Sequence, residues 1–125
     1  METQSKNNII LFNTRDELIK IDLRYVAYFH AARNYTEVFF TNGYDMLLTT
    51  SLSNIEQVLN TQKVLGRIPV FVRIGRSFII NLRHIVHIDV LRQRLVINDP
   101  KYTHVYSIEM PREALKNLKE LYTRK

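Results

Sequence analysis

A mainly β domain, with short antiparallel strands in several small sheets and two short helices, is the fold class that this sequence predicts. Short segments rich in β-branched and aromatic residues recur along most of the chain, and turn-forming residues separate them. Apolar residues recur at helical spacing in only two places. The 125 residues, 46% of them hydrophobic, suit one domain with its own core.

The first half of the chain alternates between strand-forming segments and turns. Residues 1–7 are polar and are expected to form a tail, so that the domain occupies residues 8–125. Arg15-Asp16 supplies one turn, and Asn42-Gly43 is a favoured two-residue hairpin pair. The strands are expected at residues 9–14, 17–22, 25–31, 35–41 and 44–50, with Ala32-Arg33-Asn34 between the third and the fourth.

The period of the apolar residues then changes. Apolar side chains at positions 52, 55, 58 and 59 have helical spacing and predict a helix over residues 52–61. Ser53 and Glu56 have the form of a capping box for it. Gly66 and Pro69 then interrupt the chain.

The passage from Phe71 to Ile88 is the most apolar and strand-like of the chain. Strands are expected at 78–81, 85–90, 94–98 and 102–108, with a turn at Asp99-Pro100. Pro111 is suited to the first position of a last helix, whose apolar face consists of Ala114, Leu115, Leu118, Leu121 and Tyr122. Core candidates from the passage are Phe71, Phe78, Ile80 and Leu82, and no internal repeat is recognised.

The positive charge is concentrated in one part of the chain. Lys and Arg total 18 against 12 acidic residues, a net charge of +6. Residues 63–94 alone have seven basic side chains against Asp89, and the other residues balance at eleven of each sign. The seven are Lys63, Arg67, Arg73, Arg76, Arg83, Arg92 and Arg94. Because residues 71–88 contain no acidic partner, Arg73, Arg76 and Arg83 either point to water or form a surface for an anion.

The residues offer little for catalysis. Cys is absent, and three glycines form no phosphate-binding loop. His84 and His87 would lie on opposite faces of a strand, so no metal site is expected there. No segment is apolar enough for a membrane span or a signal peptide, which favours the cytoplasm. We therefore expect a non-enzymatic protein that has neither a cofactor nor a metal.

The motif "VRIGRSFIINLRHI", residues 72–85, resembles the signature of the LytTR family of bacterial DNA-binding domains. The family form is a basic residue, a hydrophobic residue, His-Arg-Ser-Phe/Tyr, two aliphatic residues, Asn and a following Ile. "RYVAYFHAARNYTEVFFTNG", "TTSLSNIEQVL" and "EMPREALKNLKEL" resemble other family segments in the same order. The resemblance covers residues 8–121. It departs from the family form at Gly75, where His is common, and at Pro111, where Ser is usual.

The resemblance implies a function and candidate contacts. LytTR domains read the major groove of duplex DNA with loops, while flanking basic groups hold phosphates. Arg76 is the first candidate for a contact, and Asn81 of the same signature is expected to bond to backbone where the strand turns. The amides at the start of the last helix could also face a phosphate. The full set of candidates is Arg33, Asn34, Tyr35, Thr36, Arg73, Arg76, Ser77 and Arg112.

The resemblance also implies partners beyond this chain. It suggests repeated DNA half-sites, a homodimer on DNA, and an upstream receiver domain or inhibitor partner. Two other functions stay open from the residues. Seven Tyr and six Phe could stack the bases of a single-stranded nucleic acid. The basic face could instead dock an acidic protein, which predicts no binding to random duplex even at low salt.

Overall fold

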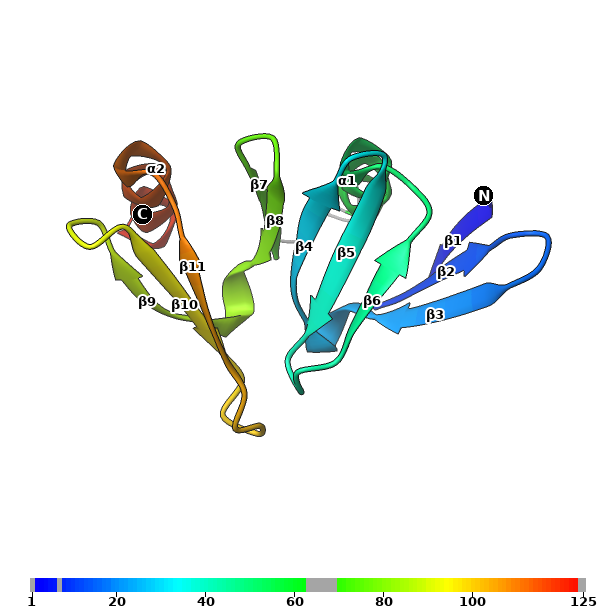
Figure 1. Cartoon of the computed structure of the whole chain (residues 1–125), viewed down its shortest axis with the longest axis horizontal. Helices are drawn as coiled ribbons and strands as arrows, with labels where there is room; N and C mark the ends of the chain where they lie inside the picture. The colour runs from blue at the N-terminus through cyan, green and yellow to red at the C-terminus, as the bar shows by residue number, and fades with distance from the viewer. Residues whose placement is uncertain (1, 7, 63–69, 124–125) are drawn as a thin grey trace.

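The computed structural model describes residues 2–6, 8–62 and 70–123 of the chain. Its strands form three antiparallel sheets, which lie side by side along the long axis of the molecule (Figure 1). The first helix lies beside the central sheet, and the second helix lies beside the third sheet. The predicted fold class, mainly β with small antiparallel sheets and two helices, is confirmed.

The first sheet corrects the expected N-terminal tail. It contains β1 (Glu2–Lys6), β2 (Ile9–Asn13) and β3 (Leu18–Asp22) in that order. Residues 2–6 form β1 and pair with β2 along its whole length. Ile10 and Phe12 alternate with less buried residues on β2, which leaves one face of this strand in the core. The polar composition of residues 2–6 concealed the strand, because an edge strand forms through backbone hydrogen bonds.

The central sheet has the order β6-β5-β4-β8-β7. Its strands are β4 (Val26–Ala32), β5 (Tyr35–Phe40), β6 (Asp45–Leu48), β7 (Phe71–Ile74) and β8 (Phe78–Asn81). The pairing of β4 with β8 joins the two halves of the chain, since Phe29 lies opposite Ile79. Both of these side chains are buried, as are the core candidates Phe71 and Ile80, while Phe78 and Leu82 are partly buried against the core.

The third sheet contains β9 (Ile85–Asp89), β10 (Arg94–Asn98) and β11 (Val105–Glu109). Helix α2 (Arg112–Thr123) follows and buries Leu115 and Leu118. Pro111 precedes the helix rather than opening it, and its carbonyl accepts a bond from the Leu115 amide. Among the described residues, no helix has the length and the apolar character that a membrane span needs.

Helix α1 (Leu52–Gln62) begins at a different cap from the expected one. The hydroxyl of Ser51 accepts a hydrogen bond from the Asn54 amide at 3.2 Å, which is the usual N-cap contact. Ser53 and Glu56 therefore do not form the predicted capping box. They lie within the helix, and both contact the side chain of Arg73. The expected break at Gly66 and Pro69 lies outside the described residues.

Two corners of the chain are built alike, although no repeat was expected. The 3₁₀ helices η1 (Leu23–Tyr25) and η3 (Leu82–His84) each join a strand of one sheet to a strand of the next. Asp22 caps η1 by accepting from the Arg24 amide, and Asn81 caps η3 by accepting from the Arg83 amide. The matching sequences Ile-Asp-Leu-Arg and Ile-Asn-Leu-Arg are too short to be recognised as a repeat without the structure.

Asn81 has a second bond that Asp22 lacks. Its side chain is fully buried, and its Nδ2 donates to the Val26 carbonyl at 2.8 Å. The same amide group therefore caps the corner with its oxygen and holds the start of β4 with its nitrogen. This confirms the expected structural role of Asn81.

Aromatic rings connect the central sheet to the third sheet. Tyr28 stacks on Phe39 at 4.5 Å between ring centroids, and Tyr106 of β11 meets the Tyr28 ring edge-on at 5.3 Å. The hydroxyl of Tyr106 donates to the Phe40 carbonyl at 2.7 Å. Burial in this cluster raises the pKa of Tyr28 to about 12. These rings therefore fasten two sheets together.

Two buried threonines provide a test of the packing at β5. Thr41→Val should raise the free energy of unfolding by about 1 kcal/mol, because the buried Thr41 hydroxyl has no hydrogen-bond partner among the described residues. Thr36→Val is the matched control, since the Thr36 hydroxyl donates to the Thr50 carbonyl at 2.8 Å. This control should lose about 1 kcal/mol. Denaturant unfolding measures both, and equal losses in the two variants would contradict the expectation.

Candidate nucleic-acid interface

Two turns at one end of the central sheet bring the main candidate residues together. Arg33-Asn34 joins β4 to β5 and is here named the Arg33 turn. Residues 75–77 join β7 to β8 and are named the Arg76 turn. The Ala31 amide donates to the Ser77 carbonyl at 2.8 Å, so the two turns are neighbours in space. Both lie at the top of the molecule in the view of Figure 1.

Of the four candidate residues in the Arg33 turn and at the start of β5, three are exposed. Arg33 and Asn34 are exposed, and Tyr35 is 48% exposed. Thr36 is fully buried with its hydroxyl bonded to Thr50, so the structure does not bring it to this surface. Arg33 has a φ of 60°, in the left-handed region that disfavours side chains. An exposed arginine thus has a backbone conformation that glycine would adopt with less strain.

The Arg76 turn presents its arginine to solvent. Arg76 is exposed, and its guanidinium has no partner among the described residues. Ser77 is partly buried. Gly75 has a φ of 60°, and a Cβ there would meet no atom within 4 Å. Glycine at position 75, in place of the family's usual His, therefore adopts this positive φ without strain. A side chain at this position would be strained by the backbone conformation but would not collide with any neighbouring atom.

Arg73 differs from the other candidates because its guanidinium is engaged by its own chain. Its side chain is 22% exposed and forms an ion pair with Glu56 of α1 at 3.0 Å. It also donates to the carbonyl oxygens of Gly75 and Arg76. Sequence reasoning missed Glu56 as a partner, because the pair joins a helix to a strand across 17 positions.

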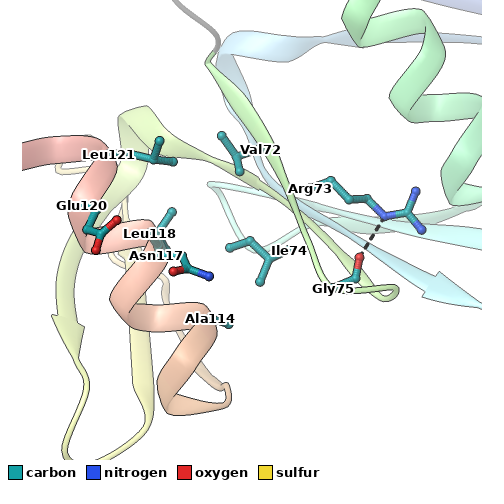
Figure 2. Close-up of a pocket in the computed structure, with 9 residues that line it drawn as sticks. All are labelled: Val72, Arg73, Ile74, Gly75, Ala114, Asn117, Leu118, Glu120 and Leu121. Carbon is teal, nitrogen blue, oxygen red and sulfur yellow. Dashed lines mark hydrogen bonds between the residues drawn. The ribbon is translucent and has the colours of Figure 1, made fainter. Parts of the chain in front are cut away.

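Arg112 lies at the start of α2 and is exposed. Its guanidinium reaches the Leu91 carbonyl at 3.4 Å. Helix α2 faces β7 across a groove of about 480 Å³, whose lining includes both Gly75 and Ala114 (Figure 2). The Arg76 turn and the first turns of α2 thus border the same groove. Ala114, in the first turn of α2, and Gly75 lie toward the same end of this groove (Figure 2).

The rest of the basic segment is dispersed. Arg83 lies in η3, at the end of β8 opposite the Arg76 turn. Arg92 lies 3.9 Å from the carboxylate of Asp89, and Arg94 is opposite Asp89 in the β9–β10 ladder. Lys63 and Arg67 lie outside the described residues. Within the described residues, the concentration of charge along the sequence therefore does not become one continuous patch.

The histidine pair has no common role. His84 belongs to η3 rather than to a strand, and its Nε2 contacts the Arg24 carbonyl at 2.8 Å. His87 lies on β9 and is exposed. In the described part of the chain, no three His, Cys, Asp or Glu side chains are grouped so that they could hold a metal ion.

Comparison with known proteins identifies the family. The model of the LytTr DNA-binding domain matches residues 16–123. Among solved structures, the chain is similar to the LytTr DNA-binding domain of a methyl-accepting/DNA response regulator from Bacillus cereus, with a TM-score of 0.60 and 19% identity. That similarity covers 94% of this chain and 98% of the other. No curated protein matches the chain. The chain belongs to the LytTR family of DNA-binding domains.

Proposed function

We propose that this domain binds duplex DNA sequence-specifically and reads the major groove with the Arg33 turn and the Arg76 turn. Arg33 and Arg76 are the proposed base or phosphate contacts, with Asn34, Tyr35 and Ser77 beside them. The observation that carries the proposal is the adjacency of the two turns, joined by the bond from Ala31 to Ser77. Two exposed guanidinium groups on neighbouring turns suit guanine edges and phosphates.

Arg112 is proposed as a third contact. Its position at the beginning of α2 supports this, because the first amides of a helix favour a nearby phosphate. Thr36 has no part in the proposed surface, since it is buried. We extend the proposal to repeated half-sites bound by two copies in the cytoplasm, with a receiver domain or inhibitor partner outside this chain.

The packing of the aromatic residues favours duplex over single-stranded DNA. Tyr28, Phe39 and Tyr106 pack against one another. The tyrosines that are about half exposed are dispersed: Tyr35 begins β5, Tyr44 lies in the turn before β6, and Tyr122 lies in α2. Stacking of successive bases needs rings along a continuous groove, so the structure offers a poor platform for a single strand.

Selection from a random duplex library at about physiological salt tests the proposed function. A defined motif should be enriched, with an affinity that falls steeply as salt rises. Single-stranded competitors of the same sequence should not displace the duplex. Binding to duplex DNA without enrichment of a motif would mean that the basic surface binds DNA without sequence specificity. A failure to bind any duplex at low salt would favour an acidic protein partner instead.

Because Arg33 has a positive φ, the variant Arg33→Gly should affect DNA binding without lowering the stability of the fold. Arg33→Gly should leave the free energy of unfolding unchanged or raise it by up to about 1 kcal/mol, because glycine accepts this backbone conformation. Specific DNA binding should weaken by about 1–3 kcal/mol if Arg33 contacts a base. Thermal unfolding and titration of the selected duplex measure the two effects.

Gln93→Gly is the matched control for that variant. Gln93 has a φ of 56° in the turn between β9 and β10, outside the proposed contacts. Its replacement should have the same small effect on stability without a loss of DNA affinity. Equal losses of affinity in the two variants would remove Arg33 from the proposed contacts.

A further inference from the structure

Arg73 extends away from the groove that its neighbours line. Successive side chains of a strand point to opposite faces. Val72 and Ile74 therefore point toward the groove beside α2. Arg73 also lines the groove, but its guanidinium points to the other side of β7, toward α1 (Figure 2). There its Nη1 donates to Glu56 Oε1 at 3.0 Å and lies 3.4 Å from the Ser53 hydroxyl. Its positive charge is thus neutralised by a carboxylate of its own chain.

The same guanidinium holds the backbone of the Arg76 turn. Arg73 Nε donates to the Gly75 carbonyl at 3.3 Å, and its Nη2 donates to the Arg76 carbonyl at 3.0 Å. The remaining carbonyl of the turn, that of Ser77, accepts from the Ala31 amide. All three carbonyls of the turn are therefore bonded within the chain. The exposed Arg76 guanidinium has no such bond among the described residues.

Among side chains, only arginine places its donors on three nitrogens in one plane, as this arrangement requires. The planar guanidinium offers five N–H donors in a fixed fork, so one side chain can bond to two carbonyls and a carboxylate at once. A lysine at position 73 would keep the charge but has a single nitrogen on a flexible stem. The bond set also connects α1 to the turn, although these elements are far apart in the sequence.

We propose that Arg73, anchored by Glu56, is a positioning residue that fixes the Arg76 turn for DNA binding and does not itself contact DNA. The inference rests on the proposed function, because Arg73 acts through the Arg76 contact. It predicts that Arg73 and Arg76 are energetically coupled. It also predicts that the turn loses order when Arg73 is changed, whether or not DNA is present.

A double-mutant cycle with Arg73→Lys and Arg76→Ala tests the coupling. Binding of the selected duplex is measured for the wild type, both single variants and the double variant. Arg73→Lys should weaken specific binding about tenfold when Arg76 is present and by less than about twofold in the Arg76→Ala background. A direct phosphate contact predicts no coupling: lysine would largely replace arginine, and any small loss would be equal in both backgrounds.

Glu56→Ala separates positioning from simple electrostatics. The variant removes a negative charge, so electrostatics alone would tighten binding to every duplex. Positioning predicts weaker binding to the selected duplex, by about three- to tenfold, because Arg73 loses its anchor. Tighter binding to the selected duplex would overturn the inference. Circular dichroism and thermal unfolding verify that each variant is folded.

Backbone relaxation of the free protein provides a readout that needs no DNA. The order parameters of residues 75–77 should fall from about 0.85 toward about 0.6 in Arg73→Lys and in Glu56→Ala. An unchanged turn in both variants would overturn the positioning role alone, even if Arg76→Ala still weakens binding. A loosened turn with wild-type affinity in every variant would instead overturn the proposed Arg76 contact, and the positioning role with it.

Discussion

Arg76→Ala is expected to weaken binding to the selected duplex by about 1–3 kcal/mol, or roughly 5- to 150-fold in Kd. The side chain is exposed on a turn whose carbonyls are all bonded within the chain, so little order has to be gained on binding. A base contact predicts a larger loss on the selected duplex than on a scrambled one. A phosphate contact predicts equal losses and a shallower salt dependence.

Arg83→Ala is the matched control for this prediction. Arg83 is an exposed arginine of the same signature passage, but it lies in η3 at the opposite end of β8. Its replacement removes the same charge and should change the affinity by no more than a small, salt-dependent amount. If Arg83→Ala weakened binding as much as Arg76→Ala does, net charge rather than the Arg76 turn would account for the affinity.

Asn81→Asp is expected to lower the free energy of unfolding by about 3 kcal/mol, or roughly 10 °C in Tm. The replacement keeps the oxygen that caps η3, but it loses the donor to the Val26 carbonyl and places a carboxylate in a fully buried site. Burial raises the pKa of the introduced carboxyl, so its neutral form is favoured in the folded state. The loss should therefore be smaller at about pH 4 than at about pH 7.

Asp22→Asn is the control for the buried amide. Asp22 caps the matching corner, but its other partner is the exposed guanidinium of Arg24, at 2.6 Å. A surface ion pair of this kind contributes little, so the change should cost less than about 1 kcal/mol. Similar losses for the two reciprocal changes would mean that the bond from Asn81 to Val26 is not what stabilises β4.

Local chemistry explains which parts of the fold could be predicted. The segments bounded by turn residues became strands nearly as expected, and β8 and β10 have the predicted bounds. The strand β1 could not be predicted, because its partner β2 rather than its own composition specifies it. The sequence pattern predicted a cap at Ser53. The structure selects Ser51, and Ser53 contacts Arg73 instead.

The candidate interface could be predicted only in part, for a similar reason. The signature marked Arg76 and Asn81 within one short segment, where neighbouring residues suffice to identify them. Arg73 belongs to the same signature, yet its engagement depends on Glu56, which is distant in sequence. The closeness of the Arg33 turn to the Arg76 turn likewise arises from the pairing of β4 with β8. Such long-range pairings leave no periodic signal in the sequence.

The strand order of the central sheet has a consequence for the spacing of a DNA target. Because β5, β4, β8 and β7 are consecutive neighbours, the midpoints of the Arg33 turn and the Arg76 turn are two strand spacings apart, or about 10 Å. A major groove is roughly 12 Å wide, so both turns fit within one groove. At about 3.4 Å per base-pair step, 10 Å along the duplex axis corresponds to about three steps. A half-site read in this way would contain two specified positions about three base pairs apart.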